Sequence, residues 1–185
     1  IIIGAGPSGI FCAYELIHRK PELKVLLVEK GRRIENRVCP KRRTKVCVGC
    51  KPCSITTGFA GAGAFSDGKL SLSPDVGGTL PDILGYEAAT ELIHDSDEIY
   101  LKFGADTSVY GIDKEKEIRE IRRKAINAGL KLIECPIRHL GTEEGYKIYA
   151  KLQEHLLAQG VEMKFETMVK EIIIEGGAAK GVRTD

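Results

Sequence analysis

The stretch that organises the rest of the chain is its beginning, Ile1-Ile2-Ile3-Gly4-Ala5-Gly6-Pro7-Ser8-Gly9. A short apolar run of this kind is typical of a buried parallel strand, and apolar residues at helical spacing follow from Ser8 to Lys20, before Pro21. A second apolar run, Val25–Val28, predicts another buried strand. Residues 1–29 therefore predict a βαβ unit with a right-handed crossover.

The turn between the first strand and the helix has the spacing G-x-G-x-x-G, and Glu29 closes the second strand twenty residues beyond Gly9. In such a turn Gly4 permits a tight bend, Gly6 lets the backbone approach a pyrophosphate, and Gly9 allows close helix packing. The helix N-terminus, where Pro7 and Ser8 stand, presents partial positive charge to phosphates. Glu29 would accept hydrogen bonds from a ribose diol and repel a 2′-phosphate, which predicts FAD or NAD rather than NADP.

The remainder of the chain continues the alternation of helices and strands. Little periodicity is found from Gly31 to about Gly78, which predicts a long structured loop. The expected elements after it are helices over 87–103 and 114–128, a strand over 130–134, a helix from an N-cap at Thr142 to before Gly160, a strand over 161–165, and a hairpin of 169–174 with 179–183 around Gly176-Gly177.

Composition places the chain among globular proteins. Its 185 residues are 43% hydrophobic and 29% charged, which fits one domain or a piece of a larger one. No apolar stretch reaches the length of a bilayer span, and no secretory signal is visible, so we expect a soluble, cytoplasmic protein with no membrane partner. Both ends of the sequence look cut.

One segment is strongly basic, because residues 30–51 hold nine Lys or Arg against the single acid Glu35. The alternatives are a solvated loop, a site for a phosphate-bearing ligand, or a docking surface for an acidic protein. Nucleic acid is less favoured, since no aromatic residue in the segment could stack on a base.

Four of the six cysteines fall within fifteen residues, at Cys39, Cys47, Cys50 and Cys53. Three thiols at x2, x2 spacing with a separate Cys-Pro are the ingredients of a four-iron four-sulfur site, although the Cys-Pro comes first here rather than last. Four thiolates could equally bind zinc, Cys47 and Cys50 could form a redox dithiol, or all could be ordinary thiols. Cys12 and Cys135 are predicted to be core thiols.

A second glycine-rich stretch runs from Gly58 to Lys69. Gly63-x4-Gly68-Lys69 is similar to a P-loop, but Leu70 replaces the magnesium-binding Ser or Thr, so a nucleotide triphosphatase is not favoured. The stretch is either a flexible surface loop or a backbone surface for an anion or a flat ring. His139 lies in an expected loop before the Thr142 helix, where a structural role is favoured over ligand contact, and no catalytic residue can be assigned.

Together with the dinucleotide fingerprint, three segments in order carry a family resemblance: Val28-Glu29-Lys30-Gly31, Gly61–Leu70 and Arg138–Thr142. The chain resembles the uncharacterised FAD-dependent dehydrogenases of the glutathione-reductase-like superfamily. The resemblance implies that residues 4–9 hold the FAD pyrophosphate, that Glu29, with Lys30 beside it, meets the adenosine ribose, and that Val169 touches adenine through its backbone. It also implies that a second loop lies along the pyrophosphate or flavin, with contacts from Gly61, Gly63, Ala64, Phe65 and Ser66.

The predicted fold is a Rossmann-like three-layer α/β domain with a parallel sheet, helices and a small β-hairpin. We expect four segments: 1–34 as the N-terminal βαβ unit, 35–80 as a Cys-rich and Gly-rich insertion, 81–135 as a helical segment, and 136–185 as the return to the FAD-binding domain, without the family's C-terminal substrate domain. The predicted function is an FAD-dependent oxidoreductase of unknown substrate. A cysteine-bound cluster, if present, would relay electrons to an acidic carrier. The alternatives are a flavin-linked dithiol reductase, a non-catalytic FAD- or NAD-binding module, and a zinc-stabilised structural or RNA-associated domain.

Overall fold

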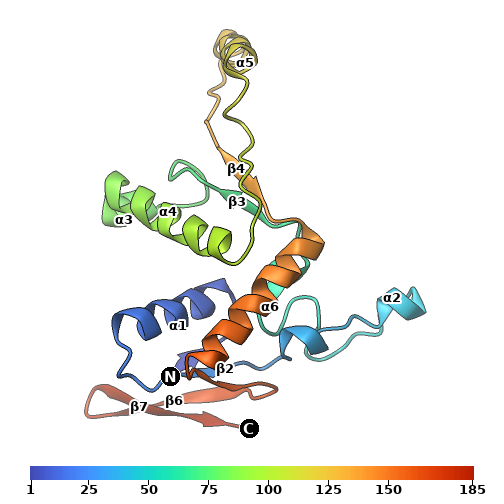
Figure 1. Ribbon diagram of the computed structural model, residues 1–185, viewed down its shortest axis with the longest axis vertical. Coiled ribbons are helices and arrows are strands. Elements are labelled where there is room, and N and C mark those ends of the chain that lie inside the picture. Colours follow the sequence, from blue (N-terminus) through green and yellow to red (C-terminus); the bar gives the residue numbers. More distant parts are fainter. The chain divides into compact units, whose positions relative to one another are not determined.

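The apolar runs at the start of the chain form a parallel sheet, as the sequence predicts. A computed structural model describes residues 1–185, which divide into two units (Figure 1). Unit 1 joins residues 1–66 to 142–185, and unit 2 comprises residues 67–141. The parallel sheet belongs to unit 1, with strand order β1 (Ile2–Ile3), β2 (Leu26–Val28) and β5 (Glu162–Lys164).

Two helices accompany this sheet in unit 1. Helix α1 (Pro7–Arg19) connects β1 to β2, and helix α6 (Thr142–Ala158) precedes β5 and contacts α1. Both helices bury apolar side chains at helical spacing, and the sheet buries its middle strand. The fully or nearly fully buried core includes Ile10, Ala13, Leu27, Val28, Ile34, Phe59, Ile148, Leu152 and Leu156. The predicted Rossmann-like α/β fold is confirmed.

An antiparallel hairpin ends unit 1. Strands β6 (Val169–Glu175) and β7 (Ala178–Thr184) pair across a turn at Gly176 and Gly177. Both turn residues have positive φ angles, which glycine adopts without steric cost, and the hairpin forms where the sequence places it. The segment from Gly31 to Ser66 contains only short elements, η1 (Ile34–Asn36), α2 (Lys41–Thr44) and η2 (Gly61–Phe65).

Unit 2 pairs two short antiparallel strands, β3 (Lys69–Ser71) and β4 (Ile137–His139), and carries three helices. The helices are α3 (Leu80–Leu84), α4 (Tyr86–Lys102) and α5 (Glu115–Asn127). Helix α4 buries Ala89, Ile99 and Tyr100, whereas α5 buries no residue. None of the helices in the structure combines the length and the apolar composition needed to cross a bilayer.

Three sequence predictions are wrong. The strand expected at 130–134 lies instead at Ile137–His139, which also puts His139 in a strand rather than a loop. The strand forms there because β3 pairs with it and Tyr110 forms a bridge to Ile137, whereas residues 130–134 have no such partner. Cys12, predicted to be a core thiol, is exposed on α1, while Cys135 is half-buried.

Candidate dinucleotide-binding site

The first glycine loop is tied to the sheet and to α1 through its backbone. Gly4 N–H donates to Val28 O at 2.7 Å, and Ile10 N–H donates to Gly6 O at 3.0 Å, which is the first hydrogen bond of the helix. Gly6 is the N-cap in an extended conformation, and no side chain caps α1. The helix therefore begins with backbone N–H groups that no capping side chain satisfies, an arrangement that suits an anion such as a pyrophosphate.

Glu29 lies directly beneath this loop. Its Oε2 accepts a hydrogen bond from Ala5 N–H, and its Oε1 accepts one from Gly31 N–H, both at 2.8 Å. The residue is only 6% exposed. A carboxylate offers about four lone-pair positions, so two acceptor positions remain beyond the two N–H groups. Glu29 thus holds the first glycine loop through Ala5 N–H, and its carboxylate has acceptor positions left for the hydroxyl groups of a ribose.

The second glycine-rich loop packs against the first. Ala60 N–H donates to Ala5 O at 2.7 Å, and a Cβ added to Gly61 would lie 3.5 Å from Gly6 Cα. A Cβ on Gly63 would lie 3.2 Å from the Tyr149 hydroxyl of α6. Because Gly61 and Gly63 have no side chains, η2 can approach both the first loop and α6 closely.

The other residues predicted in this loop lie as follows. Ala64 is buried, and the half-buried ring of Phe65 packs against the Arg37 guanidinium, whose Cζ is 4.8 Å from the ring centroid. Ser66 is exposed, and its hydroxyl donates to Gly63 O at 3.2 Å. The structure therefore brings the two loops together, with Phe65 facing Arg37 of the same unit.

The remaining predicted residues lie at the start of α1 or follow β2 and β5. Lys30 is exposed immediately after Glu29, and Pro7 and Ser8 are exposed at the start of α1. Thr167 N–H donates to Glu29 O at 3.1 Å, and Val169 opens β6 two residues later, half-buried. The chain after β5 is thus held beside Glu29.

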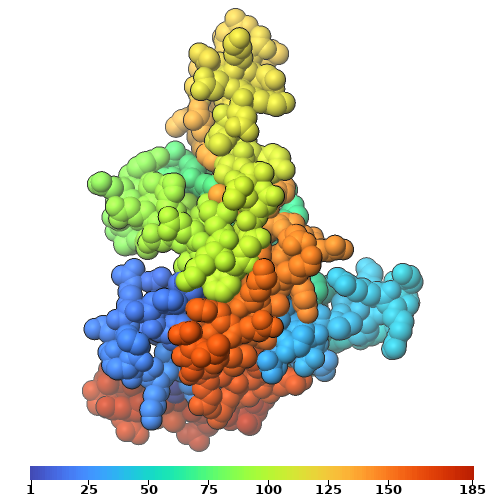
Figure 2. Space-filling model, in the orientation of Figure 1, coloured from blue at the N-terminus to red at the C-terminus, as the bar shows by residue number.

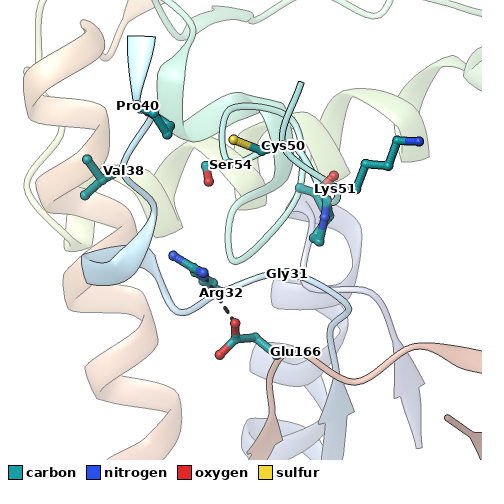
Figure 3. Close-up of a pocket in the computed structure, with 10 residues that line it drawn as sticks. Gly31, Arg32, Val38, Pro40, Cys50, Lys51, Ser54 and Glu166 are labelled. Carbon is teal, nitrogen blue, oxygen red and sulfur yellow. Dashed lines mark hydrogen bonds and ion pairs between the residues drawn. The ribbon is translucent and has the colours of Figure 1, made fainter. Parts of the chain in front are cut away.

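A cavity of about 250 Å³ lies at the same end of β2 (Figure 3). Arg32 and Glu166 meet on one side of it, with Arg32 Nε 3.2 Å from Glu166 Oε1, and Cys50 and Ser54 line the other side. Both members of the ion pair are more than half exposed, so the pair contributes little to stability. The cavity shows that the cysteine-containing loop folds back over Gly31.

Arg37 is the residue of this site that the sequence does not single out. It counts as one of nine loop cations, yet it is only 3% exposed and donates to four backbone carbonyls. Their oxygens belong to Ser54 (3.0 Å), Ile55 (2.7 Å), Phe59 (2.5 Å) and Gly61 (2.6 Å). Burial lowers the pKa of its guanidinium, which stays protonated because arginine titrates far above neutral pH. The side chain fastens the cysteine-containing loop to the second glycine loop.

We expect Arg37→Met to loosen residues 54–61 without unfolding the sheet. Methionine fills similar volume but leaves the carbonyls without donors, and a hydrogen bond to a charged group is worth about 1.5–3 kcal/mol. Limited proteolysis should cut this segment faster in the variant than in the wild type. Arg33→Met, at an exposed arginine of the same loop, serves as the control, and equal cleavage of both variants would contradict this role for Arg37.

The four cysteines proposed as metal ligands are distributed along the loop. Cys39 and Cys50 are half-buried, whereas Cys47 and Cys53 are exposed. Nowhere in the described residues 1–185 does the structure gather three or more His, Cys, Asp or Glu side chains able to hold a metal ion. As arranged here, the four cysteines do not fit a cluster or a zinc ion.

Cys53 has the surroundings of a reactive thiol. Hydrogen bonds from the backbone N–H groups of Ile55 and Thr56 lower the pKa of the Cys53 thiol, and the Arg37 cation acts in the same direction. A lowered pKa means that the thiolate, which is the nucleophile, is present at a lower pH.

The alkylation of Cys53 by iodoacetamide should therefore rise at a lower pH in the folded protein than in urea. Peptide mass spectrometry across a pH series measures this directly, with the unfolded chain as the internal reference. Superimposable pH profiles for the folded and unfolded chains would rule out the lowered pKa.

Comparisons with known proteins bear on the fold of the chain. Residues 2–44 match the family model of the NAD(P)-binding Rossmann-like domain. A search of curated proteins found no match. Among solved structures, the L-amino acid deaminase from Proteus vulgaris is similar with a TM-score of 0.52 and 17% identity, over 99% of this chain and 43% of that one.

A second structure of that deaminase, lacking its specific insertion sequence, is similar with a TM-score of 0.50 and 16% identity, over 99% of this chain and 48% of that one. The chain thus spans less than half the length of either deaminase chain. At this identity the likeness concerns the fold alone. Residues 2–44 accordingly match a Rossmann-like segment, in a chain that shares its fold with part of the L-amino acid deaminase from Proteus vulgaris.

Proposed function

We propose that unit 1 binds FAD and that the protein is an FAD-dependent oxidoreductase of the dehydrogenase type. The N–H groups that begin α1, with Gly4, Gly6 and Gly9 around them, would hold the pyrophosphate. Glu29 would accept the ribose hydroxyls, and its charge disfavours a 2′-phosphate. Lys30 and Val169 would lie toward the adenosine end.

The observation that carries the proposal is the contact between the two glycine loops. The hydrogen bond from Ala60 N–H to Ala5 O and the close approach of Gly61 to Gly6 extend the pyrophosphate surface along η2. Because the two glycine loops contact each other, a dinucleotide whose pyrophosphate lies at the first loop would have η2 beside it, as FAD requires for the part that follows the pyrophosphate. Bound flavin would supply hydride or single-electron transfer, while the protein positions it and limits solvent access.

The decisive measurement is the visible absorption spectrum of the purified protein, followed by chromatography of the cofactor released on denaturation. Two flavin bands and about one FAD per chain are expected, with bleaching on reduction. NAD in place of FAD, or no flavin after reconstitution, would overturn the proposal. Flavin that dithionite bleaches but no substrate bleaches would instead indicate a non-catalytic binding module.

A flavin-linked dithiol reductase is the second candidate. The favoured pair is Cys50 and Cys53 rather than the Cys47 and Cys50 expected from the sequence. Cys50 lines the cavity beside Gly31, and Cys53, at the same C-x-x-C spacing, has a lowered thiol pKa. A disulfide between them would take up two electrons and two protons to give two thiols. Anaerobic reductive titration separates the two candidates, because such a protein consumes four electrons per chain, whereas flavin alone consumes two.

A further inference from the structure

Six exposed cations of unit 1, all within residues 30–51, form no ion pair in the structure. Of the nine Lys and Arg residues in 30–51, Arg37 is buried, and Arg32 and Arg33 pair with Glu166 and Glu35. The other six are exposed and form no ion pair, and together they are called the basic surface: Lys30, Lys41, Arg42, Arg43, Lys45 and Lys51. Like charges gathered in this way repel one another, and a surface of opposite charge would relieve the repulsion.

The basic surface borders the second glycine loop. The Arg42 guanidinium carbon lies 5.9 Å from the centroid of the Phe65 ring in η2, on the same ring that Arg37 contacts. Arg37 in turn holds Phe59 O and Gly61 O. A partner bound at Arg42 would therefore stand beside the loop proposed to lie along the flavin.

The chemistry of the surface favours a protein as the partner. Figure 2 shows the segment that contains α2, in light blue to cyan, protruding from the rest of unit 1. Among its cations stand three exposed valines, Val38 (62%), Val46 (67%) and Val48 (57%). Exposed apolar side chains that alternate with cations along a segment suit a protein interface. Residues 30–58 contain no aromatic side chain to stack on a base or to anchor in a membrane interface.

We propose that the basic surface docks an acidic protein that exchanges electrons with the cofactor of unit 1. The inference rests on the proposed function, because it requires a redox cofactor beside η2. Opposite charge would steer the carrier to the surface, and the exposed valines would complete the contact.

Binding is tested first, by a method independent of the cofactor. Fluorescence anisotropy measures the affinity of the full chain for a labelled decaglutamate peptide. The triple variant Lys41→Glu/Arg43→Glu/Lys45→Glu should bind it at least about tenfold more weakly, since steering by local charge has effects of this size or larger. The matched control Lys20→Glu/Lys24→Glu/Lys180→Glu makes the same change in net charge at exposed lysines elsewhere in unit 1 and should bind nearly as well as the wild type.

If the two triple variants weakened decaglutamate binding equally, the effect would come from net charge alone, and the proposed docking surface would be overturned. Tighter binding of oligo-dT or of phosphatidylserine vesicles than of decaglutamate would also overturn it, in favour of nucleic acid or a membrane.

Electron exchange is tested second, on the reduced flavin-loaded protein in a stopped-flow instrument. Oxidation by the anion ferricyanide should slow about tenfold in the basic-surface variant, whereas oxidation by the cation hexaammineruthenium(III) should not slow, as opposite steering requires. Equal effects on both oxidants would overturn the electron-carrier role. A protein that binds decaglutamate as expected but takes up no flavin would disprove the proposed function and, with it, the exchange of electrons with a carrier. Only the binding of an acidic protein to the basic surface would then remain.

Discussion

Gly6→Ala is expected to give a folded protein that has lost most of its affinity for FAD. Gly6 has an ordinary extended backbone, and a Cβ added to it would have no neighbour within 4 Å. The methyl group therefore costs the protein little but occupies the space where the backbone must approach the pyrophosphate. Overpacking of this kind costs about 1–3 kcal/mol, which weakens binding about 5-fold to 150-fold. Flavin fluorescence quenching measures the dissociation constant.

Two further glycine variants separate a loss of FAD binding from a loss of stability. A Cβ on Gly9 would lie 2.0 Å from Gly4 O, so Gly9→Ala should displace the loop backbone and lower thermal stability as well as binding. Gly181→Ala is the matched control, because its Cβ would meet only Ile173 Cδ1 at 3.9 Å in the hairpin. Unchanged FAD affinity in a folded Gly6→Ala protein would show that the pyrophosphate does not lie at this loop.

Replacing Asp97 by Leu should destabilise unit 2 by about 3–5 kcal/mol, the cost of breaking one side of a buried ion pair. Arg138, only 4% exposed, binds Asp97 with two parallel hydrogen bonds of 2.6 and 2.7 Å, and its Nη1 donates to Asp106 O at 2.6 Å. The hydrogen bond to Asp97 raises the pKa of Arg138. Without Asp97 the guanidinium remains buried and uncompensated. Urea unfolding gives the loss in free energy.

The double variant Asp97→Leu/Arg138→Met tests the cause, because it removes both charges and should recover much of the stability. Glu171→Leu removes the partner of Arg183 in an exposed pair at 2.9 Å, where a change within about 1 kcal/mol is expected. If Asp97→Leu were as mild as Glu171→Leu, the buried pair would not be a principal support of unit 2.

The sequence determined the elements whose signals are local. The run Ile1–Ile3, the glycine turn and the periodicity up to Arg19 predict β1 and α1, and the Gly176-Gly177 turn predicts the hairpin. Such signals can be recognised in the sequence because they depend on neighbouring φ angles and on one buried face. For the same reason the first glycine loop and Glu29 are found together, as the fingerprint spacing predicts.

Only the tertiary structure decided which polar residues are buried and which strands pair. Arg37 looks like any cation of a basic loop until four carbonyls from residues 54–61 surround it, and Arg138 is buried only because Asp97, forty-one residues earlier, neutralises it. Strand β4 forms at Ile137–His139 rather than at 130–134 because β3 lies beside it there. The four loop cysteines, which lie within fifteen residues of sequence, do not assemble into a metal site. Partners distant in the chain settle each of these outcomes, and neither residue type nor local spacing contains that information.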